Sequence, residues 1–180
     1  MDYPSTSLSR ICCCYLATEI ADTKVIDWFS DADWWLSQGG TGHLLSFNEP
    51  DRPDQAAMTP QEAADAYRTY MHPYIGRAQL GSPAISNGGY AWLQDFLGRC
   101  SDCHIDFIAA HWYNPWNLQS DFQNWVNAIC SLANGRQVWI TEVCLQLAHS
   151  GGYWCSLVSG RRYSRPGKRV SKRGDQIFRQ

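Results

Sequence analysis

Apolar positions along the chain alternate between extended and helical spacing, and this pattern predicts four strands separated by three helices. The expected strands cover 43–47, 78–85, 105–110 and 137–141, and the expected helices cover 60–73, 90–98 and 120–133. In the last of these helices the apolar side chains recur three and four positions apart, as on one helix face. Residues 59–62, TPQE, contain a capping threonine, a proline suited to the first turn and a glutamate that completes a capping box.

This order implies parallel strands joined by crossover helices, so the expected fold class is α/β. A three-layer open sheet and a closed barrel both fit the alternation. No GxGxxG or GxxxxGK[ST] motif follows any strand, and the nucleotide-binding versions of such folds lose support. Polar residues at the end of every strand favour a (β/α)8 barrel of the TIM-barrel type, whose active site lies at that end. An additional helix is expected over 25–38.

Two of the strand-end residues are glutamates. The segment HLLSFNEPD, 43–51, reads as a buried strand that stops at Pro50. Proline cannot donate to a sheet and biases the preceding residue towards extended geometry, which leaves Glu49 at the lip of the strand. In QVWITEV, 137–143, Glu142 has the same position. A pair of carboxyl groups is what glycoside hydrolysis requires.

The composition is that of one folded domain. The chain has 180 residues, of which 44% are hydrophobic and 18% charged. The aromatic content is high, with nine tryptophans and nine tyrosines. Two interpretations stay open: the rings fill a tryptophan-rich core, or some of them line a sugar-binding cleft with a flat apolar face and a polar tip.

The net charge of −2 conceals a basic end. Residues 161–180 carry eight basic side chains and one acidic side chain, so this segment is +7 and residues 1–160 are −9. Basic tails can bind nucleic acid or anionic membranes. The sequence loses its pattern after residue 143, so we expect a disordered tail. No recognised nucleic-acid-binding fold is present, so we expect no nucleic-acid partner. No run of about 18 apolar residues exists, so no transmembrane segment is expected.

Eight cysteines are compatible with export to an oxidising compartment, although the N-terminus is a poor match to a signal peptide. Cys100 and Cys103 form a CxxC pair, for which a redox pair, half of a zinc site and a structural disulfide are the alternatives. No second cysteine pair lies at ligand spacing, and this favours the disulfide and no metal site.

Four segments in order carry a family resemblance: HLLSFNEPD, LGSPAISNGGYAWLQDFL, CSDCHIDFIAAHWYN and GRQVWITEV. Together, over about residues 40–145, they resemble glycoside hydrolase family 128, the fungal alkali-sensitive-linkage-like catalytic cores. The resemblance implies a (β/α)8 barrel with endo-β-1,3-glucanase activity and a retaining mechanism. It implies that Glu49 is the acid/base at the end of the fourth strand and Glu142 the nucleophile at the end of the seventh. It further implies a β-glucan polysaccharide or oligosaccharide as partner, and an extracellular or cell-wall location. The mechanism requires no cofactor, and we expect a monomer.

Other side chains near the strand ends are candidates for substrate binding. Asn48 is placed to bond the 2-hydroxyl of the sugar, and Tyr113 or His111 to orient Glu142. The full set of candidates is Asn48, Asn87, His111, Trp112, Tyr113 and Trp116. Each has a structural alternative: Asn87 as a turn residue, His111 as a satisfied core histidine, and the two tryptophans as packing rather than stacking on glucose.

The ends of the chain depart from the family pattern. A barrel of this type needs about 250 residues, yet only about 40 precede the fourth-strand motif and no clear eighth strand follows residue 143. We therefore expect an incomplete barrel in residues 1–160, with strands four to seven recognisable and both ends altered from family sequence. The alternative function is a catalytically inactive barrel fragment that binds cell-wall glucan without cutting it.

Overall fold

The structure is a computed structural model that describes residues 22–38, 42–115, 117–146 and 153–156. The expectations for Trp116 and for the tail 161–180 lie outside these ranges. The elements are α1 (Asp22–Ser37), β1 (His43–Leu44), α2 (Pro60–Tyr70), the 3-10 helix η1 (His72–Tyr74), β2 (Gln79–Leu80), α3 (Tyr90–Arg99), β3 (Phe107–Pro115), α4 (Gln119–Leu132), β4 (Gln137–Gln146) and β5 (Tyr153–Ser156).

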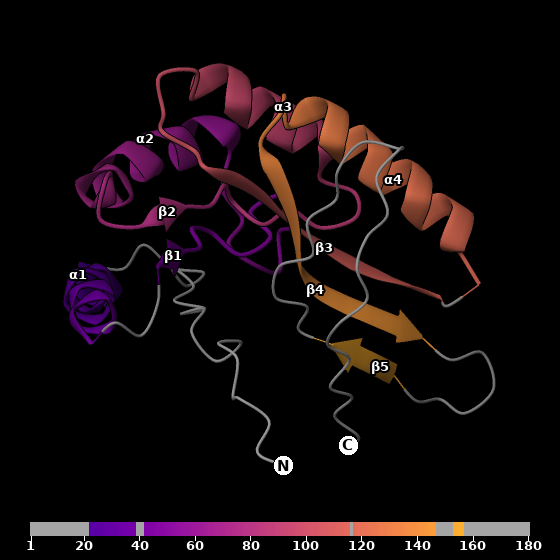
Figure 1. Cartoon of the computed structure of the whole chain (residues 1–180), viewed down its shortest axis with the longest axis horizontal. Coiled ribbons are helices and arrows are strands. Elements are labelled where there is room, and N and C mark those ends of the chain that lie inside the picture. Colours follow the sequence, from indigo (N-terminus) through magenta and orange to yellow (C-terminus); the bar gives the residue numbers. More distant parts are fainter. Residues whose placement is uncertain (1–21, 39–41, 116, 147–152, 157–180) are drawn as a thin grey trace, which may run out of the picture.

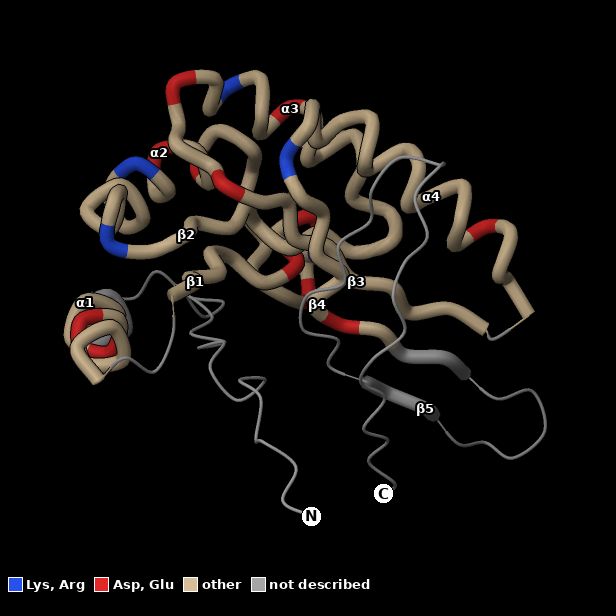
Figure 2. Tube along the Cα trace, in the orientation of Figure 1, with Lys and Arg blue, Asp and Glu red and all other residues tan. Residues whose placement is uncertain are grey.

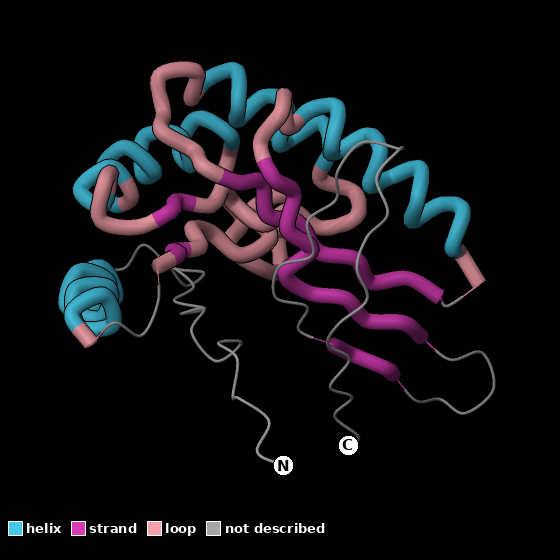
Figure 3. Tube along the Cα trace, in the orientation of Figure 1, coloured by secondary structure: helices cyan, strands magenta, loops and turns pink. Residues whose placement is uncertain are grey.

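The strands follow one another across the sheet in chain order, and the parallel arrangement expected from the sequence is confirmed. β1 pairs with β2 and β3 pairs with β4, both in parallel. Single parallel bridges from Gly81 to Phe107 and from Ile85 to Ala110 connect the segment of β2 to β3. Helices α2, α3 and α4 lie together on one side of these strands (Figures 1, 2 and 3). This places the carboxyl ends of four consecutive parallel strands next to one another.

Side chains of β3 alternate between two apolar clusters, as the pleat of a strand requires. Ile108 and Ala110 belong to the large core that includes the buried faces of the helices. Phe107 and Ala109 belong to a second cluster on the opposite face of the sheet, where the Phe107 ring stacks on Trp139 with centroids 4.4 Å apart. The sheet therefore has apolar contacts on both faces, as expected for parallel strands.

Helix α2 begins where the sequence predicts. The Thr59 hydroxyl accepts a hydrogen bond from the Glu62 backbone N–H, and the Glu62 carboxylate accepts one from the Thr59 backbone N–H. These reciprocal bonds satisfy donors that a helix start otherwise exposes. The Glu62 carboxylate also accepts a hydrogen bond from the Thr59 hydroxyl. The bonds that it accepts from the backbone N–H and the hydroxyl of Thr59 lower the pKa of Glu62.

Two strands run further than their sequence pattern indicates. β3 was expected to end at residue 110 but continues through His111 to Pro115, and β4 continues to Gln146. A register shift between Ala110 and His111 marks the point where the apolar run ends. After β4 the chain forms β5, antiparallel to β4, where no clear strand was expected. Within the described residues, no helix is both long and apolar enough to span a membrane.

Candidate active site

The backbone at Glu49 differs from the sequence expectation. Pro50 was expected to hold the preceding residue in extended geometry, but Glu49 has a φ of +39°. This is the left-handed region, which is unfavourable for a residue with a side chain. A backbone hydrogen bond from Glu49 N to Ala84 O at 2.7 Å holds the residue there, beside the bridge between Asn48 and Ala84. The neighbouring strand thus overrides the local preference.

A second contact joins the loop after β1 to the loop after β2. The Asp51 carboxylate accepts hydrogen bonds from the Ser86 backbone N–H at 3.0 Å and from the Ser86 hydroxyl at 2.5 Å. Gly89 makes the approach possible, because a Cβ there would lie 2.6 Å from the Ile85 Cβ and 2.8 Å from the Asp51 Cγ. The segment that carries Glu49 is therefore held at Glu49 itself and two residues later.

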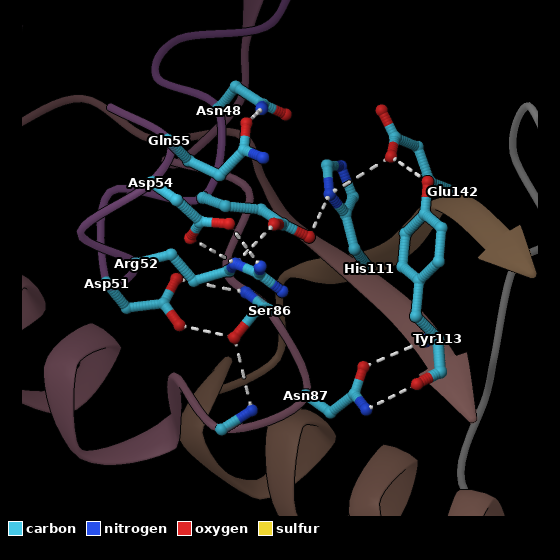
Figure 4. A network of polar contacts seen from close by, with 12 residues as sticks. Asn48, Asp51, Arg52, Asp54, Gln55, Ser86, Asn87, His111, Tyr113 and Glu142 are labelled. Carbon is cyan, nitrogen blue, oxygen red and sulfur yellow. Dashed lines mark hydrogen bonds and ion pairs between the residues drawn. The ribbon is translucent and has the colours of Figure 1, made fainter. Parts of the chain in front are cut away.

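His111 brings the two glutamates together. Its ring is fully buried, and its Nδ1 lies 3.0 Å from Glu49 Oε1. The same atom lies 3.4 Å from Glu142 Oε2 (Figure 4). The three groups come from the loop after β1, from β3 and from β4. One ligand-type atom from each residue lies within 4.8 Å of the others, so the carboxylates face each other across the imidazole. The expected contact of His111 with Glu142 is present, and the expectation that His111 binds substrate stays a prediction.

These contacts define which ring nitrogen of His111 donates a hydrogen bond. Nδ1 faces two carboxylate oxygens, which can only accept when ionised, so Nδ1 carries a proton and donates to Glu49. Nε2 is buried and has no hydrogen-bond partner within the described residues. His111 is therefore arranged with Nδ1 as its donor to Glu49.

Tyr113 holds Glu142 from the other side. Its hydroxyl donates to Glu142 Oε2 at 2.5 Å, and the two side chains project from paired strands. Partial burial raises the pKa of Tyr113 well above its usual range, and the hydrogen bond to Glu142 and the charges of Glu142 and Glu49 raise it further. Tyr113 consequently stays a hydrogen-bond donor throughout the pH range of ordinary proteins.

The side-chain amide of Asn87 contacts the backbone of Tyr113. The Asn87 Oδ1 accepts from Tyr113 N at 2.8 Å, and Nδ2 donates to Tyr113 O at 2.9 Å. Both ends of the amide are thereby engaged with the backbone of β3. Asn87 thus holds the strand segment that carries Tyr113, and the expectation that it binds substrate stays a prediction.

The loop after β1 places an amide and a cation beside Glu49. Asn48 Nδ2 donates to Gln55 Oε1 at 3.0 Å, and Asn48 Oδ1 is buried with no partner among the described residues. Arg52 Nε lies 3.4 Å from Glu49 Oε2 and also binds Asp54. Asn48 therefore remains a candidate sugar ligand, with one polar atom still to satisfy.

Trp112 is a core residue, contrary to the sequence expectation of a sugar-stacking ring. Its side chain is buried and its ring centroid lies 5.2 Å from those of Phe122 and Trp125 of α4. Successive residues of a strand point to opposite faces, so a strand that directs His111 and Tyr113 to the site must direct Trp112 away from it. For this ring the packing interpretation is the correct one.

The CxxC pair forms a disulfide between Cys100 and Cys103 at the end of α3. Beside it, Arg68 of α2 makes two hydrogen bonds to the Asp102 carboxylate, at 2.7 and 3.0 Å, and one to the Arg99 carbonyl. The bonds from Arg68 lower the pKa of Asp102 to about 2. This group lies at the start of the strands, away from the two glutamates, and joins α2 to α3.

Sequence reasoning missed the charged residues of the loop after β1. Asp51, Arg52 and Asp54 follow Glu49 directly, but a charged loop gives no sign of which contacts it makes. Their proximity to a strand-end glutamate was the available signal. In the described part of the chain, Glu49, His111 and Glu142 are also the one cluster of side chains that could ligate a metal ion. Nδ1 of His111 already occupies the space between the carboxylates.

Comparison with known proteins identifies the family of this chain. Residues 3–153 match the family model of the glycosyl hydrolase catalytic core. Alkali-sensitive linkage protein 1 of Schizosaccharomyces pombe is 47% identical over 112 residues, which cover 57% of this chain and 19% of that protein. The resemblance to glycoside hydrolase family 128 seen in the sequence is thereby confirmed at the level of the family.

Two solved structures of glycoside hydrolase family 128 are similar to the chain. One is a curdlan-specific exo-β-1,3-glucanase of Blastomyces gilchristii in complex with glucose, with 44% identity, a TM-score of 0.64, and coverage of 67% of this chain and 55% of that one. The other is an endo-β-1,3-glucanase of Sorangium cellulosum, with 28% identity, a TM-score of 0.57 and coverage of 67% and 53%. The chain thus spans about half the length of these relatives. The likeness indicates a TIM-barrel-like glycosidase fold, and the incomplete barrel stays a prediction.

Proposed function

Because the chain belongs to the glycosyl hydrolase catalytic core family, we propose that it hydrolyses β-1,3-glucan with Glu49 as acid/base and Glu142 as nucleophile. The family supports hydrolysis of a glycosidic bond. The solved relatives support the β-1,3 linkage, since both are described as β-1,3-glucanases. One of them is an exo-enzyme and the other an endo-enzyme. The length of the released products distinguishes cleavage at the end of the glucan from cleavage within it.

The observation that carries the proposal is the separation of the two glutamates. A carboxylate oxygen of Glu49 and one of Glu142 lie within 4.8 Å of each other. Retaining glycosidases have carboxyl groups about 5–5.5 Å apart, whereas inverting enzymes need about 6.5–9.5 Å to accommodate a water molecule. The short separation supports direct attack by one carboxylate, and hence a retaining mechanism.

In the first step a Glu142 oxygen attacks the anomeric carbon and forms a glycosyl ester. The bond to the glycosidic oxygen breaks, and that oxygen keeps the electron pair and takes the proton from Glu49. In the second step Glu49 takes a proton from water, the water oxygen attacks the anomeric carbon, and the bond to Glu142 breaks. Both residues finish in the protonation state in which they began.

Neighbouring side chains position these two groups. The Tyr113 hydroxyl fixes the orientation of Glu142, and His111 Nδ1 lies between the glutamates. We propose that the unpartnered Asn48 Oδ1 accepts a hydrogen bond from the 2-hydroxyl of the sugar, because such bonds strengthen in the transition state. We further propose a monomer that acts on a fungal-type cell wall outside the cell.

The test is release of reducing ends from a soluble β-1,3-glucan by the purified chain. Glu142→Gln is expected to abolish release, and Glu49→Gln to reduce it by about 10²–10⁴-fold. Asp95→Asn, an exposed carboxylate on α3, is the control and should retain activity. NMR of the first product should show the β-anomer, and product length distinguishes exo from endo cleavage. Activity that survives both glutamate variants would refute the assignment, and a folded chain that binds glucan without cutting it would favour the inactive binding alternative.

A further inference from the structure

We infer that Arg52 and Asp54 together set the pH range in which Glu49 can act as the acid. The inference rests on the proposed function and goes beyond it, because it assigns a role to two loop residues outside the reacting pair. Arg52 acts through Glu49 and is therefore a positioning residue rather than a catalytic one. Asp54 acts one step further away, as the counter-charge of Arg52.

The guanidinium of Arg52 contacts the carboxylates of Glu49 and Asp54, and Figure 4 shows Arg52 beside Asp54. Its Nε is 3.4 Å from Glu49 Oε2. The same Nε donates to Asp54 Oδ1 at 3.0 Å, and Nη2 donates to Asp54 Oδ2 at 2.6 Å. Asp54 thus receives the two directed hydrogen bonds, and Glu49 receives mainly the electrostatic attraction of the cation.

This arrangement differs from an ordinary surface ion pair because one of its carboxylates, that of Glu49, is buried. Exposed pairs contribute little because water screens both charges. Here one of the three charges is inside: the Glu49 side chain is 7% exposed, whereas that of Arg52 is 44% exposed. The backbone bond from Arg52 N to Glu49 O at 3.0 Å fixes the loop so that the cation stays over this carboxyl group.

Both loop residues remain charged across the range in which a glycosidase works. The hydrogen bond and the charge of Asp54, followed by the charges of Glu49 and Asp51, raise the pKa of Arg52. The hydrogen bond from Arg52 lowers the pKa of Asp54. Neither group changes its charge across this range, so each exerts a constant field on Glu49.

Other groups also face Glu49, and they stay the same in the variants used below. His111, Tyr113 and Glu142 face it from the sheet. Asp51 lies on the same loop, but its carboxylate is bonded to Ser86. A difference between variants at positions 52 and 54 therefore reports on these two residues alone.

The signs of the two effects are opposite. A cation near a carboxyl group favours its ionised form. Removing the cation with Arg52→Gln lets Glu49 keep its proton to higher pH, so the alkaline limb of the kcat/KM profile shifts to higher pH. Removing the counter-charge with Asp54→Asn strengthens the effect of the Arg52 cation on Glu49. The alkaline limb therefore shifts to lower pH. Because Arg52 is half exposed, each shift should be about half a pH unit at low salt and smaller at high salt.

The experiment compares pH profiles of kcat/KM on a soluble β-1,3-glucan for the wild-type chain and these two variants at low ionic strength. Arg52→Lys keeps the charge and should restore the position of the limb. Arg99→Gln is the matched control: its side chain is also 44% exposed and pairs with a carboxylate, Asp95, but it ends α3, far from Glu49. Its profile should coincide with the wild type. Shifts in the same direction, or no shift, for Arg52→Gln and Asp54→Asn would overturn the inference.

A second measurement does not depend on activity. Carbon-13 NMR of chains labelled in the glutamate side-chain carboxyl, with Glu49→Gln to assign the resonance, follows the protonation of Glu49 directly. The expected midpoints move in opposite directions for the two variants, as in the kinetics. If the wild type proves inactive, the proposed function fails while this titration still decides the role of Arg52 and Asp54: opposite shifts support it and unchanged midpoints refute it.

Discussion

The side-chain amide of Asn87 bonds to both backbone polar groups of Tyr113, in the way that a neighbouring strand would. It accepts from the backbone N–H at 2.8 Å and donates to the carbonyl at 2.9 Å. Tyr113 in turn donates its hydroxyl to Glu142 at 2.5 Å. A residue on the loop after β2 thus reaches the proposed nucleophile on β4 through one intermediate on β3.

Replacing Asn87 should therefore impair catalysis without affecting the affinity for glucan. In Asn87→Ala the backbone of β3 loses two neutral hydrogen bonds, each contributing about 0.5–1.5 kcal/mol. We expect kcat to fall about 10-fold with KM unchanged. Steady-state kinetics on a soluble β-1,3-glucan measure both. A rise in KM at constant kcat would instead favour a direct contact between Asn87 and the sugar.

Tyr113→Phe removes the hydroxyl donated to Glu142 and should have a larger effect. A hydrogen bond to a charged group contributes about 1.5–3 kcal/mol, so kcat should fall by about 10–100-fold. The melting temperature should not change, because the Tyr113 side chain is 45% exposed. Tyr90→Phe, another exposed tyrosine, serves as control. If Asn87 acts through Tyr113, adding Asn87→Ala to Tyr113→Phe should cause little further loss, whereas additive losses would show that the two residues act independently.

Much of the fold could be predicted from the sequence because local and tertiary preferences agree there. The capping box at Thr59 is a local signal, and α2 begins where it indicates. The order of parallel strands also follows from the alternation of apolar patterns. β5 gave no such signal, because pairing with β4 is a tertiary event. The left-handed geometry of Glu49 likewise depends on a partner 35 residues away, Ala84.

The candidate site was predictable in position but less so in role. Strand ends meet at one edge of a parallel sheet, so Glu49, His111 and Glu142 were expected near one another, and they are. Whether a polar side chain faces a ligand or a neighbour depends on contacts that no spacing encodes. Asn87 and Trp112 were assigned to substrate for this reason, yet one bonds the backbone of Tyr113 and the other packs under α4.

Substitution of Trp112 should reduce stability rather than sugar binding. Removing a buried aromatic side chain costs about 3–5 kcal/mol for a change to alanine, and less for Trp112→Phe, which keeps most contacts with Phe122 and Trp125. We expect urea unfolding of Trp112→Phe at lower denaturant concentration, with KM for glucan unchanged. A higher KM at unchanged stability would restore the sugar-stacking interpretation that the structure corrects.

The contact between Arg68 and Asp102 should make stability depend on acid pH. Hydrogen bonds from Arg68, and then one from the backbone of Asp102 itself, lower the pKa of this carboxyl group to about 2, against an ordinary value of about 4. A group whose pKa is lower in the folded state stabilises the fold when it is ionised. Its contribution is complete above about pH 4 and disappears as the pH falls towards 2.

Asp102→Asn should accordingly melt at a lower temperature than the wild type at pH 6, and the difference should vanish near pH 2. Arg68→Gln removes the other partner and should show the same dependence, together with the loss of its bond to the Arg99 carbonyl, which does not titrate. The contribution is modest because Asp102 is exposed and salt screens it. Melting curves at several pH values test this, and a difference between wild type and Asp102→Asn that persists unchanged at pH 2 would show that neutral hydrogen bonding, rather than charge, joins α2 to α3.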